Sequence, residues 1–260
     1  MDKFIYKKSL GQNFLQDQNI INKIVNTSGV DKETLVVEIG PGSGNLSKEI
    51  IPLSGYSILY EIDERLKDVL LEKLKEYNNY KLIIGDFLKQ DISNIRNDYN
   101  FKKIYIVANL PYYITTPIIT KITDLIYPDR IVIMIQEEVA DRLSAKCGTK
   151  EYAMISVLLG AKYDIKKLFR VSKNCFIPAP QVNSSVIMME KNDKLKGVDE
   201  VKFSQLIKDA FTFKRKNLKN NLSSYNLNKI ADFLDRYNYT LSNRAEDIPI
   251  DVFIEMAKIL

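Results

Sequence analysis

The chain of 260 residues contains no histidine and no tryptophan, and it has only two cysteines. Without imidazole a Ser-His-Asp triad cannot form, and the usual mixed cysteine and histidine zinc sites lack parts. Cys147 and Cys175 do not have C-x-x-C spacing, so neither a disulfide framework nor a metal motif is indicated. Any chemistry must therefore proceed without imidazole, and we expect no metal in the site.

Long hydrophobic runs are also missing, since no stretch of about 18 apolar residues occurs. Residues 1–8 lack the continuous apolar core of a signal peptide. With 45% hydrophobic and 27% charged residues, the composition is that of an ordinary globular chain, long enough for one α/β domain and a small appendage. We expect a cytoplasmic protein without a membrane segment.

The formal net charge of +5 is modest, and by itself it explains no more than solubility. Its distribution is more informative, because basic residues gather in two separate clusters. These are Lys3, Lys7 and Lys8 near the N-terminus, and Lys214, Arg215, Lys216 and Lys219 beside Phe211 and Phe213. Two such clusters predict a surface that binds the phosphates of a nucleic acid. The RNA-binding candidates are Lys7, Lys8 and the four residues of the second cluster.

The stretch that organises the chain is an apolar run, residues 35–39, followed by glycine at every second position. The glycines are Gly40, Gly42 and Gly44, and an amphipathic segment comes next. This pattern predicts a buried parallel strand, a tight loop and a helix. Glycine adopts positive φ without steric cost, so the loop lets an adenosine-bearing cofactor approach the main chain.

The glycine spacing separates two classes of cofactor. The dinucleotide fingerprint G-x-G-x-x-G would require glycine where this chain has Asn45, which argues against NAD. The observed pattern places an acid, Glu38, two residues before Gly40. It matches motif I of class I methyltransferases, which use S-adenosyl-L-methionine and release S-adenosyl-L-homocysteine.

Of two further predicted strands, the one at residues 56–63 ends in acids and the one at residues 80–85 runs directly into Asp86. Glu61 stands where a carboxylate of a doubly wound sheet accepts both ribose hydroxyls of a nucleotide. Asp86 stands where an acid can accept from the exocyclic amine of the cofactor's adenine. Taken alone, each acid is equally explained as a solvated or capping carboxylate, but their order along the chain favours a cofactor site.

The fourth predicted strand, residues 103–108, ends in Asn109-Leu110-Pro111-Tyr112. Proline fixes φ and keeps the preceding residue extended, so the Asn109 amide and the Leu110 carbonyl are presented in a defined direction. Two acceptors beside an aromatic ring suit a planar base that bears an amino group. The sequence therefore indicates methyl transfer to adenine N6, in which alignment rather than a strong base carries the catalysis.

The remaining segments predict the domain organisation. Residues 1–16 form an arm that we expect to close over a ligand, and Asp17 caps the first helix. A fifth strand (131–136) and strands 163–171 and 185–190 complete a catalytic domain over residues 1–190. A polar linker follows, and helices predicted at 201–213, 218–224, 227–237 and 249–260 form an all-helical domain, residues 198–260, that we expect to dock RNA.

Six segments together give the chain a specific resemblance. They are residues 8–15 (KSLGQNFL), 38–44 (EIGPGSG), 61–63 (EID), 85–86 (GD), 109–114 (NLPYYI) and 176–184 (FIPAPQVNS). In this combination the chain resembles the KsgA/Dim1 family of small-subunit rRNA adenine dimethyltransferases. The resemblance implies an α/β class I methyltransferase, Rossmann-like with a seven-stranded sheet. It also implies transfer of two methyl groups to N6 of each of two adjacent adenosines near the 3′ end of 16S rRNA, during assembly of the 30S subunit.

The resemblance also assigns roles to residues, and we expect the protein to act as a monomer. The family's cofactor contacts would fall on Asn13, Leu15, Gly40, Glu61, Asp86 and Asn109. The catalytic residues would be Asn109, Leu110, Tyr112 and Phe176, the last supplying a second stacking face. The chain departs from the family at one of these positions, since many members have histidine where Asn13 stands. Asparagine can replace histidine there if the side chain makes only a single hydrogen bond.

Two other functions fit the same fold. An Erm-type 23S rRNA adenine methyltransferase, which confers macrolide resistance, shares the chemistry, but Leu110, Tyr113 and the proline loop after Phe176 favour the small-subunit enzymes. A non-catalytic nucleic-acid-binding protein on this scaffold is the other alternative. The intact set Glu61, Asp86 and Asn109 argues against it.

Overall fold

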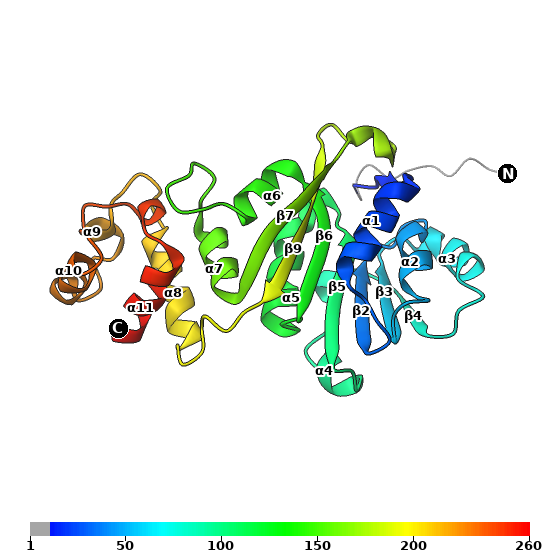
Figure 1. The fold of residues 1–260 in the computed structure, drawn as a ribbon, viewed down its shortest axis with the longest axis horizontal. Coiled ribbons are helices and arrows are strands. Elements are labelled where there is room, and N and C mark those ends of the chain that lie inside the picture. The colour runs from blue at the N-terminus through cyan, green and yellow to red at the C-terminus, as the bar shows by residue number, and fades with distance from the viewer. Residues whose placement is uncertain (1–10) are drawn as a thin grey trace. The chain divides into compact units, whose positions relative to one another are not determined.

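The computed structural model describes residues 11–260, which form two compact units (Figure 1). The first unit comprises residues 11–140 and Lys166–Glu190, and the second comprises Asp141–Ile165 and Lys191–Leu260. The expected arm lies partly in residues 1–10, and the basic residues Lys3, Lys7 and Lys8 lie wholly there, outside the described residues.

A mixed seven-stranded sheet forms the centre of the fold, as predicted. Its strands, in the order in which they lie side by side, are β4 (Tyr80–Ile84), β3 (Tyr56–Glu61), β2 (Thr34–Ile39), β5 (Lys103–Asn109), β6 (Arg130–Gln136), β9 (Ser184–Lys191) and β7 (Tyr163–Val171). The strands from β4 to β6 are parallel, and β9 runs antiparallel to β6. The fold is therefore an α/β fold with its parallel strand ends on one edge.

The central strands are buried on both faces, which explains their continuous apolar runs. All six residues of β2 are buried. Val36, together with strand residues of β5 and β6, packs in one cluster with Ile21 and Ile24 of α1 (Gln18–Ser28). Leu35 and Val37 point to the other face and are equally inaccessible. Burial on both faces is typical of parallel sheets covered by helices.

Helices of the first unit follow the strands in the alternating order that the sequence predicts. They are α2 (Asn45–Ile50), α3 (Lys67–Lys73), α4 (Ile95–Asp98), α5 (Thr115–Leu125) and the start of α6 (Glu137–Leu143). The predicted cap of α1 is confirmed, since Asp17 Oδ1 accepts from the backbone N–H groups of Asn19 and Ile20 at 2.9 and 3.2 Å.

A second, two-stranded sheet joins the end of the arm to the proline loop. Strand β1 (Phe14–Leu15) pairs antiparallel with β8 (Phe176–Ile177), so that Leu15 lies opposite Phe176. Both side chains are buried in the cluster that contains α1. The sheet fixes where the arm crosses the edge of the main sheet.

The second unit is built from α7 (Met154–Lys162), α8 (Glu200–Ala210), α9 (Leu218–Asn221), α10 (Leu227–Asp235) and α11 (Ile250–Ile259). Its core joins Tyr152, Val157 and Ala161 to buried residues of α8 and α11. One division between the two units falls after Glu190. Residues 141–165, which we expected in the catalytic domain 1–190, instead pack with the helices, because their apolar side chains complete the helical core.

Over residues 11–260, none of the helices combines the length and the apolar character needed to cross a bilayer.

Candidate active site

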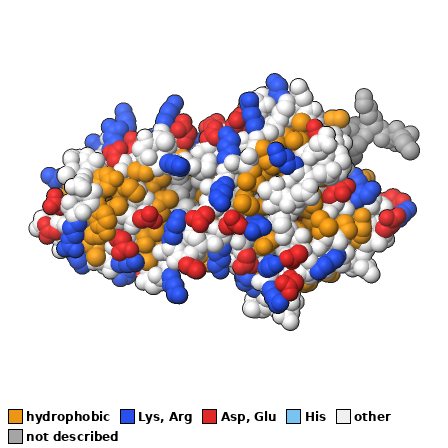
Figure 2. Space-filling view, viewed as in Figure 1, with side chains coloured by type: hydrophobic (Ala, Val, Ile, Leu, Met, Phe, Trp, Pro, Cys, Tyr) orange, Lys and Arg blue, Asp and Glu red, His pale blue; other side chains and the backbone are white. Residues whose placement is uncertain are grey.

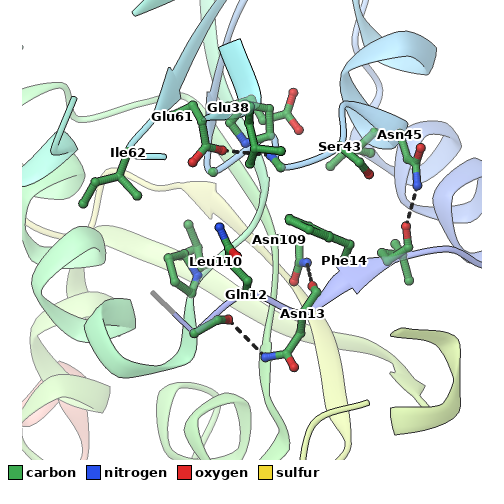
Figure 3. Close-up of a pocket in the computed structure, with 18 of the residues that line it drawn as sticks. Gln12, Asn13, Phe14, Glu38, Ser43, Asn45, Glu61, Ile62, Asn109 and Leu110 are labelled. Carbon is green, nitrogen blue, oxygen red and sulfur yellow. Dashed lines mark hydrogen bonds between the residues drawn. The ribbon is translucent and has the colours of Figure 1, made fainter. Parts of the chain in front are cut away.

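A cleft opens at the edge where β2, β3 and β5 end (Figure 3). The space within it amounts to about 740 Å³, part of which is open to solvent. Most of its lining comes from four stretches, the arm at residues 11–15, the glycine loop and the start of the helix after it (40–43, 45 and 46), residues 61 and 62, and the turn at 109–112, and Glu38 and Leu66 complete it. Ligands of open α/β sheets bind at such an edge.

The glycine loop has the backbone that its composition predicts. Gly40, Gly42 and Gly44 have φ values of +72°, +59° and +73°. Glycine is required at Gly42 for a second reason, since a Cβ atom there would lie 2.7 Å from the ring of Phe14. Phe14 therefore packs directly on the loop, and the arm forms one wall of the cleft.

Glu61 lies in the cleft at the end of β3 and is almost fully buried. Its Oε2 accepts from the N–H of Gly42 at 3.0 Å, and its Oε1 accepts from the N–H of Asp63 at 2.8 Å. Burial raises the pKa of the Glu61 carboxyl, and these backbone hydrogen bonds oppose the rise. Each carboxylate oxygen has a further lone pair, so the group can still accept from a vicinal diol.

Glu38 is a second buried carboxyl in the lining of the cleft. Its Oε2 accepts from the Ser47 hydroxyl at 2.6 Å, which ties the end of β2 to α2. Burial raises the pKa of the Glu38 carboxyl to about 8, and the nearby charge of Glu61 contributes to the rise. At neutral pH Glu38 therefore retains its proton, and a neutral acid stands beside the one we expect to bind the diol.

Asn109 ends β5 and reaches across to the arm, where its Nδ2 donates to the Asn13 carbonyl at 3.2 Å. Its Oδ1 accepts no hydrogen bond from residues 11–260, so this acceptor remains for a ligand. Pro111 has φ −63° and ψ 130°, and the Leu110 N–H donates to the Met134 carbonyl at 3.1 Å. The predicted rigid exit from the strand is present.

Tyr112 follows this turn and lines the cleft. Its hydroxyl shares a hydrogen bond with the hydroxyl of Ser184, a fully buried residue of β9. Burial raises the pKa of the Tyr112 hydroxyl, and the bond to Ser184 opposes the rise. Ser184 belongs to the segment that carries the resemblance, but its contact with Tyr112 could not be predicted from the sequence.

Phe176 does not lie where a second stacking face was expected. It is 2% exposed, packs in the cluster beside α1 and is not among the residues lining the cleft. Pairing of β8 with β1 turns its side chain into the core, so in this structure Tyr112 alone of the two rings faces the cleft.

Asn13 and Leu15 of the arm are among the residues that line the cleft. The Leu15 side chain is buried, whereas its carbonyl accepts from Asn45 Nδ2 at 2.8 Å. The Asn13 side chain donates to the Gly11 carbonyl at 3.1 Å, and Gln12 Nε2 donates to the Asp63 carboxylate at 2.7 Å. Three side chains of the main body, those of Asn45, Asp63 and Asn109, thus hold the arm across the cleft.

Asp86 stands apart from the other predicted cofactor residues. It caps the short helix after β4 by accepting from the Leu88 N–H at 2.9 Å, and it does not line the cleft. Ile62, which the sequence did not single out, does line the cleft and is 40% exposed. An apolar side chain directly after the diol acid is the signal that could have identified it.

The basic residues of the second unit, Lys214, Arg215, Lys216 and Lys219, are all exposed. In Figure 2, Lys and Arg side chains border the hydrophobic ones on the face of the helices that is in view. Within residues 11–260, no group of three His, Cys, Asp or Glu side chains is placed to hold a metal ion.

Comparison with known proteins gives one family over nearly the whole chain. The family described as ribosomal RNA adenine dimethylase matches residues 3–260. The chain is 38% identical to the ribosomal RNA small subunit methyltransferase A of Listeria welshimeri, over 99% of this chain and 91% of that protein. It is also 38% identical to the protein of that name from Bacillus cereus, over 99% of this chain and 92% of that protein.

Solved structures give the same fold. A dimethyladenosine transferase from Plasmodium falciparum matches with a TM-score of 0.79 and 22% identity, over 94% of this chain and 95% of that one. The 23S rRNA methyltransferase ErmE matches with a TM-score of 0.77 and 22% identity, over 95% of this chain and 100% of that one. At these identities the similarity shows the α/β methyltransferase fold alone. The family match and the 38% identity over 99% of the chain show more: this protein belongs to the ribosomal RNA adenine dimethylase family.

Proposed function

We propose that the cleft binds S-adenosyl-L-methionine and that the protein dimethylates N6 of two adjacent adenosines near the 3′ end of 16S rRNA. The observation that supports this proposal most strongly is that the glycine loop, Glu61 and the Asn109-Leu110-Pro111-Tyr112 turn all line the same cleft. The substrate is the assembling 30S subunit, and the protein acts in the cytoplasm as a monomer.

The lining of the cleft supports the following roles for the cofactor residues. Glu61 would accept both ribose hydroxyls, and the open backbone at Gly40 would admit the rest of the nucleoside. Ile62 would cover one face of the adenine. The role of Asp86 as the hydrogen-bond partner of the adenine amine stays a prediction. The carbonyl groups of Asn13 and Leu15 lie on the arm, the opposite wall of the cleft from the strand-end acids.

The acceptor residues act by alignment. When bound, S-adenosyl-L-methionine supplies an electrophilic methyl group on a positively charged sulfur. Asn109 Oδ1 and the Leu110 carbonyl would accept the two hydrogens of the adenine amine, so that its lone pair points at the methyl carbon. Tyr112 would stack on the base once it leaves the helical stack. No strong base is needed because the charge on sulfur is neutralised during transfer, and the surplus proton leaves the amine afterwards.

Nucleoside analysis tests this proposal. The full-length protein is incubated with methyl-labelled cofactor and with 30S particles from cells that lack the modification, and the RNA is digested to nucleosides. We expect the label in N6,N6-dimethyladenosine. Label in another nucleoside, or no transfer to any ribosomal particle, would contradict the proposal.

A further inference from the structure

The second unit contains a pocket that the methylation chemistry does not use. The space within it amounts to about 540 Å³, part of which is open to solvent, and all the residues that line it belong to the helical unit. The walls are the start of α7, the loop 211–217 between α8 and α9, and the turn around Ala245 and Glu246.

The floor of this pocket consists of aromatic rings that are held in place. The Tyr152 hydroxyl donates to the Ile248 carbonyl at 3.1 Å, which fixes the ring of this buried residue. The Phe211 ring lies 6.3 Å from that of Tyr152 and 6.0 Å from that of Phe253, between centroids. A planar ligand would therefore meet rings that are already ordered.

The loop over the pocket is fixed as well, and it exposes an aromatic side chain. Asn221 Nδ2 donates to the carbonyls of Ala210 and Phe213 at 2.6 and 3.3 Å, and the Lys216 N–H donates to the Phe213 carbonyl at 2.9 Å. Despite this ordered backbone, the Phe213 side chain is 62% exposed. Asn221 is one of the residues that line the pocket.

The charges around the pocket favour an anionic, planar ligand. Lys214 and Lys216 line it and are exposed. Glu246, the one acid that the described part of the chain places in the lining, lies 3.6 Å from the Arg244 guanidinium, so its charge is partly compensated. Cations next to aromatic faces match the two parts of a nucleotide, since the base stacks on the rings and the phosphate meets the ammonium groups.

We propose that this pocket binds one unpaired nucleotide of the RNA substrate, with its base stacked on Phe213 and its phosphates at Lys214 and Lys216. The inference rests on the proposed function only for the identity of the RNA. It adds a second base-binding site, in the helical unit, to the cleft in which methylation takes place.

The test uses a short single-stranded RNA with one 2-aminopurine, whose fluorescence falls when the base stacks. The protein has no tryptophan, so its own emission does not interfere. For Phe213→Ala we expect roughly 5- to 150-fold weaker binding and less quenching, the range that stacking of one base supports. Val201→Ala is the matched control, because Val201 is an 80% exposed apolar residue of the same unit outside the pocket.

The cleft could also stack a base, so each variant is repeated in a Tyr112→Ala background. A loss on Phe213→Ala that persists there supports the pocket. The inference is overturned if Tyr112→Ala alone abolishes the quenching. It is also overturned if Phe213→Ala and Val201→Ala bind the RNA equally well. Methyl transfer by the wild-type protein is measured in parallel, so that failure of the pocket is distinguished from failure of the proposed function.

Discussion

At the scale of single residues, Glu38 and Glu61 end neighbouring parallel strands, and burial raises the pKa of both carboxyls. Only Glu61 has two backbone N–H groups that favour its ionised form. These hydrogen bonds oppose the effect of burial on the pKa of Glu61, whereas no backbone N–H group of the described residues opposes it at Glu38. The sequence predicted Glu61 from its place after a strand, but the pKa of Glu38 depends on burial, which the sequence does not show.

Glu38→Gln tests the protonation of this buried acid. The folded protein keeps the proton up to about pH 8, whereas the unfolded chain releases it near pH 4.5, so ionisation costs stability as pH rises between these values. The wild type should lose about 2 to 4 kcal/mol of unfolding free energy between pH 5 and 8 through Glu38, and Glu38→Gln should lack this loss. Denaturant titration at both pH values measures it, and parallel curves for the two proteins would refute the assignment.

Glu61→Ala tests the cofactor site. A diol that faces a methyl group loses two charge-assisted hydrogen bonds worth about 1.5 to 3 kcal/mol each, so affinity for S-adenosyl-L-methionine should fall by at least about 100-fold. Isothermal calorimetry measures the affinity. Glu61→Gln keeps an acceptor oxygen, so its affinity for the cofactor should lie between that of the wild type and that of Glu61→Ala. An unchanged affinity for the alanine variant would sink the site assignment.

Asn109 and Tyr112 have different proposed roles, alignment and stacking, and their variants should differ accordingly. Loss of the Tyr112 ring removes about 1 to 3 kcal/mol of stacking. Asn109→Ala removes the acceptor that orients the amine, and it should reduce the single-turnover rate more than Tyr112→Ala does. The measurement uses saturating cofactor and 30S particles. A near-normal rate for Asn109→Ala with an inactive Tyr112→Ala would show that the amide does not orient the nucleophile.

At the scale of elements, the order of strands and helices was predictable because buried parallel strands appear as apolar runs that end at glycines, acids or proline. The pairing of β1 with β8 was not. Strands of two residues leave no periodic pattern, and their partners lie far apart in the sequence. The burial of Phe176 was missed for the same reason, since the pairing decides which way its ring points.

The packing of the arm on the glycine loop can be tested with two glycine variants. Gly42 and Gly148 have φ values of +59° and +80°, so alanine is strained at both, but a Cβ atom meets Phe14 only at Gly42. We expect Gly148→Ala to cost about 1 kcal/mol and to leave cofactor affinity unchanged. Gly42→Ala should in addition displace Phe14 and weaken cofactor binding. Equal effects of the two variants on affinity would show that the arm is not part of the site.

At the scale of the whole molecule, the chain forms a unit with the sheet, which contains the cleft, and a helical unit, which contains the exposed residues Lys214, Arg215, Lys216 and Lys219. The change in pattern after residue 190 led us to expect two such domains. The sequence could not predict that 141–165 joins the helices, because helix α7 has the same apolar character whichever core it completes.

The basic cluster of Lys214, Arg215, Lys216 and Lys219 leads to a prediction about how salt affects RNA binding. If Lys214, Arg215, Lys216 and Lys219 bind phosphates, replacing them with glutamine should weaken binding to 30S particles. It should also flatten the dependence of log affinity on log salt by roughly 0.7 to 0.9 for each phosphate that is no longer neutralised. Filter binding over a range of salt concentrations measures the slope. A slope equal to that of the wild type would mean that these residues form only a solvated surface.

The most direct test of the account is to map the methylated nucleotides after supplying under-methylated 30S and 50S particles side by side with labelled cofactor. We predict label on two adjacent adenosines near the 3′ end of 16S rRNA and none on 23S rRNA. Label confined to an adenosine of 23S rRNA in the 50S particle would contradict it.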